Sequence, residues 1–289
     1  TQKSQNEDRS GYHLVLLAKN ITGYRNLCKL VSYGWVDGFY YRPRIDHEIL
    51  KQYSEGIIAT SACLGGEIHK KVESGKIKAA EEAILWYKEV FGDDYYIELQ
   101  RHKTDKPNAD YECFEKQQRQ NIELIKLAQK TNTKLVATND VHFVEEEHGE
   151  AHERLICLST GKDLEDPPRM RYTNQEWLKT PAQMLQIFAD VPDALENTLE
   201  IANKVEFYDI DSAPMMPVFP IPEEFGTEAH YTSLFTPDML RDEFGDGFER
   251  LGGYEKVVRV KLEADYLSKL AYEGAKQRYG EVLDDEKIE

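Results

Sequence analysis

The chain has 289 residues, of which 36 are Lys or Arg and 53 are Asp or Glu, so its net charge is −17. This excess of negative charge repels a phosphate backbone and argues against a primary DNA-binding surface within these residues. The length favours two domains. The longest uninterrupted apolar run, residues 14–18, is far shorter than the roughly 20 residues that cross a bilayer, so we expect no membrane association.

The cysteines and the first residues indicate the cellular setting. Cys28, Cys63, Cys113 and Cys157 lie far apart in the sequence, which excludes a Cys-x-x-Cys zinc or redox motif. Reduced thiols in a cytoplasmic protein are the simplest interpretation. The first ten residues are polar and contain neither an initiator methionine nor a secretory signal, so we expect an internal piece of a longer protein.

Short apolar runs alternate with longer helical patterns between residues 12 and 142, as in repeated βα units. Aliphatic and aromatic residues predict strands at 12–18, 56–60, 95–100 and 134–138. Apolar residues at three- and four-residue spacing predict helices at 22–36, 78–91 and 109–130. The pattern therefore predicts an α/β fold with a largely parallel sheet.

After residue 142 the pattern changes to consecutive helices without a convincing strand. We expect these helices at 147–158, 181–189, 193–205, 228–243 and 254–279. Four prolines between residues 214 and 222 remove backbone donors, so this segment is expected to be extended. The sequence thus predicts three parts, at residues 1–210, 211–223 and 224–289.

Asp140 and His142 follow the last predicted strand in the run Ala137-Thr-Asn-Asp-Val-His-Phe143. If the strand continues, both side chains point to the same side, because side chains alternate along a strand. A carboxylate and an imidazole beyond the carboxyl end of a parallel strand suit a divalent ion. The alternative is an aspartate that caps the next helix and a histidine packed on Phe143.

Glu98 lies inside an otherwise apolar strand, where a buried carboxylate needs a partner. It is either a metal ligand or half of a structural ion pair, and the residue alone favours the ion pair. Gln100 and His102 share its face if the strand extends that far. His13 opens the first strand, and a lone histidine at a strand start is usually structural.

Two further patterns have weaker functional interpretations. His148 and His152 stand four apart on a predicted helix, but the order of residues lacks the glutamate that a zincin motif needs, which favours surface or interdomain histidines. Cys63 precedes a Gly-Gly pair that fits either an anion cradle or a tight turn. A catalytic role for Cys63 is disfavoured because no histidine lies beside it in sequence.

Four segments taken together resemble the alpha subunits of bacterial DNA polymerase III. They are the His13-Leu-Val-Leu-Leu-Ala-Lys-Asn run with its Gly-Tyr-Arg-Asn-Leu27 continuation, Ser61-Ala-Cys-Leu-Gly-Gly-Glu67, Tyr96-Ile-Glu-Leu-Gln100 and Ala137-Thr-Asn-Asp-Val-His-Phe143. The likeness continues through Phe188-Ala-Asp-Val-Pro and Pro217-Val-Phe-Pro220 and so covers nearly the whole chain. It implies an incomplete PHP-type (polymerase and histidinol phosphatase) distorted β/α barrel at 1–210, followed by a mostly helical extension. Residues 224–289 would then lead towards the polymerase palm.

The resemblance implies that His13, Glu98, Asp140 and His142 are metal ligands, for zinc, manganese or iron. Other ligands of the family, including a His-x-His pair, are expected upstream, and the palm acids with their Mg²⁺ downstream. Clustered metals lower the pKa of bound water and polarise phosphoryl oxygens, as phosphodiester hydrolysis requires. The PHP domain is therefore expected to support 3′–5′ exonuclease proofreading in some members and to serve as a scaffold in others.

For the whole protein, the resemblance implies template-directed DNA synthesis from dNTPs on a primed template. The implied partners are the sliding clamp, the clamp loader and the proofreading subunit, and the fragment alone is expected to be inactive. Two alternatives remain: a free-standing phosphoesterase similar to histidinol phosphatase, and a metal-free barrel that docks a proofreading subunit. The helical chain after residue 150 favours the polymerase over a compact phosphatase.

Overall fold

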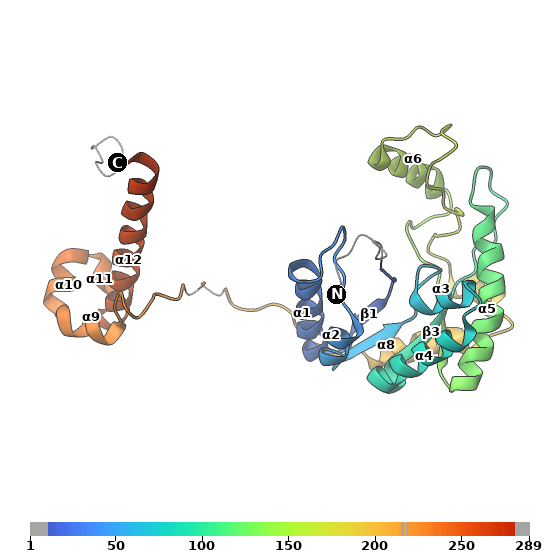
Figure 1. Ribbon diagram of the computed structural model, residues 1–289, viewed down its shortest axis with the longest axis horizontal. Helices are drawn as coiled ribbons and strands as arrows, with labels where there is room; N and C mark the ends of the chain where they lie inside the picture. Colours follow the sequence, from blue (N-terminus) through green and yellow to red (C-terminus); the bar gives the residue numbers. More distant parts are fainter. Residues whose placement is uncertain (1–10, 215–216, 218, 281–289) are drawn as a thin grey trace. The chain divides into compact units, whose positions relative to one another are not determined.

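The computed structural model describes residues 11–214, 217 and 219–280. Its chain divides into two compact units, Thr1–Asp211 and Ser212–Glu289, which are described separately below. Figure 1 shows an α/β first unit and an all-helical second unit.

An open sheet with the order β1-β2-β3-β4 forms the centre of the first unit. Its strands are β1 (Val15–Ala18), β2 (Ile57–Thr60), β3 (Tyr95–Leu99) and β4 (Lys134–Ala137). The expected parallel pairing is present between β2, β3 and β4, whereas β1 runs antiparallel to β2. An apolar run predicts a strand but not its direction, which depends on the path of the connecting chain.

Helices cover the sheet and account for most of the first unit. They are α1 (Ile21–Val36), α2 (His47–Gln52), α3 (Glu67–Glu73), α4 (Ile77–Phe91), the 3₁₀ turn η1 (Gly92–Asp94), α5 (Tyr111–Thr131), α6 (His148–Thr160), α7 (Pro181–Ile187) and α8 (Asp193–Lys204). The long helices agree with the expected ranges. The short helices α2 and α3 were not predicted, because six and seven residues are too few to show a helical period.

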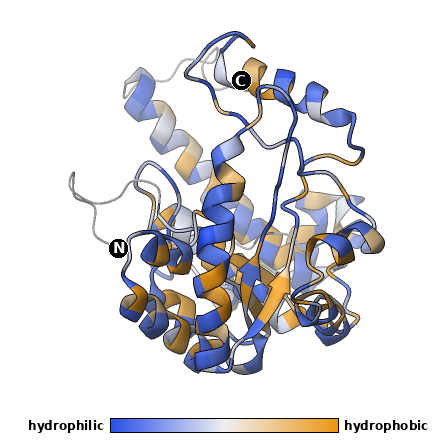
Figure 2. Cartoon of the chain, turned by 90° about the vertical axis from the view of Figure 1, so that its right-hand side faces the viewer, coloured by the Kyte–Doolittle hydropathy of each residue, from blue (hydrophilic) through white to orange (hydrophobic). Residues whose placement is uncertain are grey.

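The two faces of the sheet pack against different helices. Ile58, Tyr96 and Val136 form one buried cluster with Ile201 of α8. The alternate residues of β2 and β3, such as Ile97, join the main core with apolar side chains of α3, α4 and α5. Because both faces are covered, β2 and β3 are buried along their whole length. Figure 2 shows these apolar strands inside a layer of helices whose outer faces are hydrophilic.

The Lys-Asn-x-x-Gly-Tyr-Arg-Asn motif fixes the start of α1 against the loop before β2. The Asn20 side chain accepts a hydrogen bond from the Gly23 amide and so caps the helix. A β-carbon on Gly23 would lie 1.8 Å from the Gly56 carbonyl oxygen, so only glycine fits there. One turn later, the buried Asn26 amide donates to the Glu55 carbonyl at 3.0 Å. The motif is therefore explained by helix capping and close backbone packing.

The second unit consists of α9 (Glu228–Leu234), α10 (Pro237–Phe244), α11 (Gly247–Arg250) and α12 (Tyr254–Tyr279) within its described residues. The prediction of a single helix at 228–243 is wrong, because Thr236 caps a new helix whose first residue is Pro237. Helix α12 has the expected bounds. Its buried side chains form a separate core with residues of α9, α10 and α11, such as Leu240.

No helix in the described part of the chain is long and apolar enough to span a membrane.

Candidate metal centre

The topology brings the four candidate ligands to one edge of the sheet. β3 and β4 are parallel and end together, with Leu99 opposite Ala137, so Glu98 lies near the point where the chain turns towards Asp140. β2 ends beside them at Thr60, which pairs with Val15 at the start of the antiparallel β1. Because β1 is antiparallel to β2, the start of β1 lies beside the end of β2. His13, just before β1, therefore lies at the same edge of the sheet.

His13 lies against the turn that follows β2. Its amide donates to the Gly65 carbonyl at 3.0 Å, and its Nδ1 is 3.3 Å from the Cys63 sulfur. A β-carbon on Gly65 would approach the His13 ring to 3.0 Å, so glycine lets the imidazole lie on the backbone. The Gly66 amide donates to the Cys63 carbonyl at 2.7 Å, as in a tight turn. Of the two interpretations of this Gly-Gly pair, the structure supports the tight turn.

Cys63 is a site residue that sequence reasoning missed. No histidine is near it in sequence, yet His13 contacts it in space. Burial raises the pKa of the Cys63 thiol, and the carboxylates of Asp140 and Glu98 raise it further, although a hydrogen bond from the Gly65 amide acts in the opposite sense. A thiol with a raised pKa is a poor nucleophile without a nearby cation.

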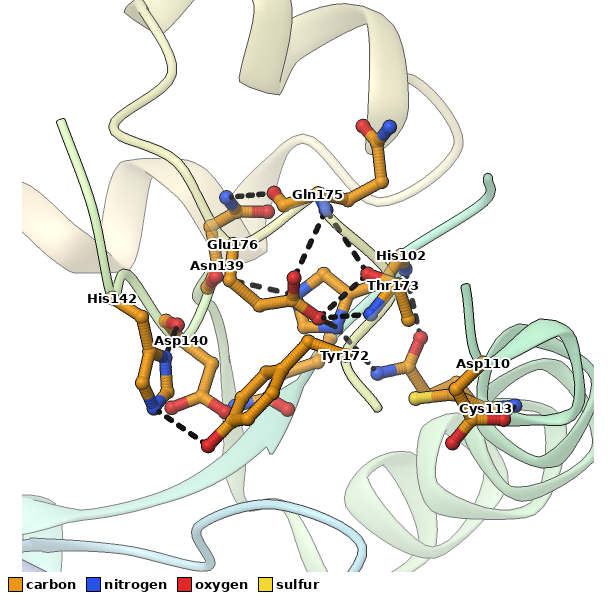
Figure 3. Close-up of polar contacts among 12 residues, drawn as sticks. His102, Asp110, Cys113, Asn139, Asp140, His142, Tyr172, Thr173, Gln175 and Glu176 are labelled. Carbon is orange, nitrogen blue, oxygen red and sulfur yellow. Dashed lines mark hydrogen bonds and ion pairs between the residues drawn. The ribbon is translucent and has the colours of Figure 1, made fainter. Parts of the chain in front are cut away.

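Asp140 and His142 lie in a loop, because β4 ends at Ala137. The expectation that strand alternation aligns them is therefore wrong; instead, Asp140 has a left-handed backbone, with φ of 44°. His142 Nδ1 donates to the Asp140 carbonyl at 2.6 Å, which leaves the Nε2 lone pair facing the Tyr172 hydroxyl at 3.2 Å. Figure 3 shows both side chains beside Tyr172. A fixed tautomer with a directed Nε2 lone pair is typical of metal-binding histidines.

Glu98 is buried and forms hydrogen bonds with neutral partners. Its carboxylate accepts from the hydroxyls of Thr60 and Thr138 and from the Gln100 amide at 3.0 Å. These three donors use most of the roughly four lone-pair positions of a carboxylate. The structural alternative was an ion pair, and among the described residues no Lys, Arg or His pairs with Glu98. Metal binding by Glu98 stays a prediction.

A buried polar network holds the Asp140 loop in place. His102 Nε2 donates to the Asn139 carbonyl at 3.2 Å, and His102 Nδ1 accepts from the Gln117 amide at 3.0 Å. The Asn139 side chain donates to the Gln175 carbonyl (Figure 3). It also donates to the Trp177 carbonyl. Burial lowers the pKa of His102 despite the Glu176 carboxylate 3.9 Å away, so the ring is neutral.

Glu176 connects the same network to His142. The Glu176 carbonyl accepts from the His142 amide at 2.7 Å, and its carboxylate accepts from the amide and hydroxyl of Thr173. Both Glu176 and His102 are more than nine-tenths buried. Glu176 and His102 belong to segments far apart in the sequence. The one sequence signal that could have indicated them is a polar residue where a buried residue is expected.

The two histidines of α6 have different environments. His148 Nδ1 accepts from the Glu145 amide at 3.3 Å, close to the start of the helix. The His152 ring packs 5.5 Å from His142 and 4.9 Å from Tyr172, measured between ring centres. His148 is exposed, as expected of a surface histidine, whereas His152 is partly buried against the rings of His142 and Tyr172.

The donors at this edge suit a borderline-soft cation such as Zn²⁺ in their chemistry. Two imidazoles, a thiol and a carboxylate come from His13, His142, Cys63 and Asp140. They lie as two pairs, His13 with Cys63 and Asp140 with His142. Within residues 11–214, 217 and 219–280, however, no group of three or more His, Cys, Asp or Glu side chains is placed to hold a metal ion. The described residues alone therefore form no complete ligand set.

A family model for the PHP domain matches residues 2–102. The chain therefore contains a PHP domain, whose match ends before Asp140 and His142. DNA polymerase III subunit alpha of Borreliella burgdorferi is 40% identical over 242 residues, which cover 83% of this chain and 20% of that protein. The corresponding subunit of Campylobacter jejuni is 36% identical over 283 residues, covering 93% of this chain and 22% of that protein.

The DNA polymerase III subunit alpha of Pseudomonas aeruginosa is 38% identical over 269 residues, covering 92% of this chain and 21% of that protein. The matched part of this chain extends well beyond the PHP domain. The chain is a homologue of part of the DNA polymerase III alpha subunit, and it spans about one fifth of the length of these relatives.

Proposed function

We propose that this chain is the PHP-containing part of a replicative DNA polymerase that acts in the bacterial cytoplasm. The supporting observation is identity of 36–40% to polymerase III alpha subunits over 83–93% of the chain. A compact phosphatase would have no reason to match after residue 150. The whole protein would extend a primed template with dNTPs, using Mg²⁺ in its palm, in association with a sliding clamp, a clamp loader and a proofreading subunit.

We also propose that residues 1–210 are an incomplete PHP barrel, that 211–223 link it to the rest, and that 224–289 lead into the palm. This chain alone would polymerise nothing, because it spans only about one fifth of the length of the polymerase subunits that it matches.

The PHP part would bind a divalent metal through His13, Cys63, Asp140 and His142, together with ligands outside the described residues. Glu98 is retained as a weaker candidate. A metal bound there would lower the pKa of a water molecule and polarise a phosphoryl oxygen, the chemistry of 3′–5′ exonuclease activity. The chain's own contribution is orientation: the Asp140 carbonyl fixes the tautomer of His142. The Asp140 and Glu98 carboxylates raise the pKa of the Cys63 thiol, and a nearby cation would lower it.

The test uses the full-length alpha subunit that contains this chain. We expect it to extend a primer on a template and to degrade a primer with a mispaired 3′ end. Asp140→Asn should lower the degradation rate by about 100-fold or more, as loss of a metal ligand does, and should leave primer extension within about twofold. No primer extension would contradict the polymerase assignment. An unchanged degradation rate in Asp140→Asn would contradict the proposed metal centre but not the polymerase assignment.

A further inference from the structure

The loop between α1 and α2 is a tight, built turn. A β-carbon on Gly38 would lie 1.8 Å from the Arg44 carbonyl oxygen, so the outgoing and returning chains touch there. The Tyr40 amide donates to the Arg42 carbonyl at 3.1 Å, and Tyr41 at the tip has a φ of 61°. A tyrosine in the left-handed region is uncommon and costs conformational energy. The turn therefore holds the aromatic side chain of Tyr41 at a defined position.

This loop and the end of α1 expose aromatic rings. Trp35 and Tyr41 are each 59% exposed, and Phe39 is 42% exposed. The Trp35 and Phe39 rings are stacked with centres 5.6 Å apart, while Tyr41 contacts the edge of Tyr40 at 4.7 Å. Large flat side chains open to water in this number are unusual on a protein surface and mark an interaction site.

Arginines interleave with these rings. The Arg44 guanidinium lies over the Tyr40 ring at 5.3 Å, and Arg42 is exposed. Among the residues that the structure describes, no carboxylate forms an ion pair with Arg42. Of the two acids that flank the loop, Asp46 is engaged as the side-chain cap of α2 and Asp37 follows α1. In a chain with a net charge of −17, this loop thus presents the exposed guanidinium of Arg42 beside aromatic rings.

Arg44, at the end of the loop, lies near the chain that leads to His13 of the candidate metal centre. A β-carbon on Gly11 would meet the Arg44 side chain at 3.7 Å, and Gly11 is two residues before His13. Aromatic rings interleaved with arginines are the general means of binding single-stranded nucleic acid, because every base has a face that can stack. A strand that entered the metal centre would have unpaired bases at its 3′ end.

We propose that residues 35–44, the aromatic loop, bind single-stranded DNA next to the metal centre. Trp35, Phe39 and Tyr41 stack on unpaired bases and Arg42 contacts a phosphate. The choice of DNA as the ligand rests on the proposed polymerase function. With one or two cations involved, binding depends on salt only weakly, with a slope of about −0.7 to −1.4 in log affinity against log salt.

The experiment measures binding of a fluorescein-labelled (dT)₁₂ to the full-length alpha subunit by fluorescence anisotropy. Ala at Trp35, Phe39 or Tyr41 should each weaken binding by about 5- to 150-fold, the loss of one stacked base. Tyr41→Asn removes the ring but tolerates the left-handed backbone, so it keeps the fold. Tyr41→Phe should bind as the parent does. Tyr272→Ala, at a tyrosine on α12 that is 50% exposed, is the matched control and should change nothing.

Two further measurements decide the nature of the contact. An oligonucleotide with abasic sites should bind as weakly as the alanine variants, and (dT)₁₂ should protect Trp35 from acrylamide quenching. Equal affinity of abasic and intact strands, or unchanged affinity in all three alanine variants, would overturn the proposal. Protection of Trp35 before DNA is added would also overturn it, because a protein surface would then cover the loop. If the subunit extends primers but fails these tests, the DNA-binding role of the aromatic loop is wrong and the proposed polymerase function stands.

Discussion

Glu67 is the residue on which three helices of the first unit converge. Its carboxylate accepts hydrogen bonds from His47 of α2 at 3.0 Å and from Tyr87 of α4 at 2.9 Å, and it pairs with Lys71 of α3. Burial alone would raise the pKa of Glu67, but the hydrogen bonds from His47 and Lys71 outweigh it and lower the pKa to about 2. The ionised carboxylate is therefore part of what holds these helices together.

We expect Glu67→Gln to lower the free energy of unfolding at pH 7 by about 2 kcal/mol, the loss of charge-assisted hydrogen bonds. Because the folded-state pKa is below the ordinary 4.5, the stabilisation is complete above about pH 4.5 and is lost as the pH falls towards 2. The difference between parent and variant should shrink over that range. Urea unfolding at several pH values measures it.

Glu89→Gln is the control for this prediction. Its carboxylate pairs with Lys51 at 2.7 Å, but both side chains are more than half exposed, so the pair contributes little. If the two variants behave alike at every pH, the proposed role of Glu67 is wrong.

The sequence indicated part of the metal centre at the level of single residues. The short Asp-x-His motif and the buried Glu98 can be found by inspection, because each departs from its local pattern. Cys63 could not be found this way, since its contact with His13 depends on β1 running antiparallel to β2. His102 supports the site only through tertiary hydrogen bonds, which no local pattern encodes.

At the scale of elements, the approach of α1 to the turn before β2 depends on two glycines. Gly23→Ala would place a β-carbon 1.8 Å from the Gly56 carbonyl oxygen, and both partners are backbone. We expect a loss of about 3 kcal/mol or more in the free energy of unfolding, at the upper end of overpacking costs. Thermal or denaturant unfolding of the first unit measures it.

Gly274→Ala tests the same substitution at a position with open space for the added β-carbon. Gly274 lies within α12 with no atom within 4 Å of an added β-carbon. Alanine there should raise stability by about 0.5–1 kcal/mol, because glycine is a poor helix former. Equal effects of the two substitutions would refute the close-packing explanation.

Helices were predicted correctly where they are long enough to show several repeats of the apolar spacing. Helix α12 was expected at its observed bounds, and α4 within one residue at its start. The failures have local causes: α3 is too short for a period, and the new cap at Thr236 divides a helical pattern in two. The direction of a strand could not be predicted for a different reason. It is set by the path of the chain that connects two strands and not by the residues of the strand.

At the scale of the whole molecule, each unit has its own apolar core. Ile97 is fully buried in the core of the first unit, and Leu240 is fully buried in that of the second. Separate cores with no shared residues should unfold independently. Leu240→Ala should destabilise the second unit by about 2–5 kcal/mol and leave the first transition unchanged, and Ile97→Ala should do the reverse. Calorimetry of the chain measures both transitions, and one shared shift would contradict independence.

We propose that His13, Cys63, Asp140 and His142 contribute to one metal centre. The most direct measurement is the near-ultraviolet absorption of the full-length alpha subunit loaded with Co²⁺ in place of its own metal. We predict a thiolate-to-cobalt charge-transfer band that disappears in Cys63→Ser and persists in Cys113→Ser, the matched control on α5. A subunit that binds no cobalt, or a band that survives Cys63→Ser, would contradict the claim.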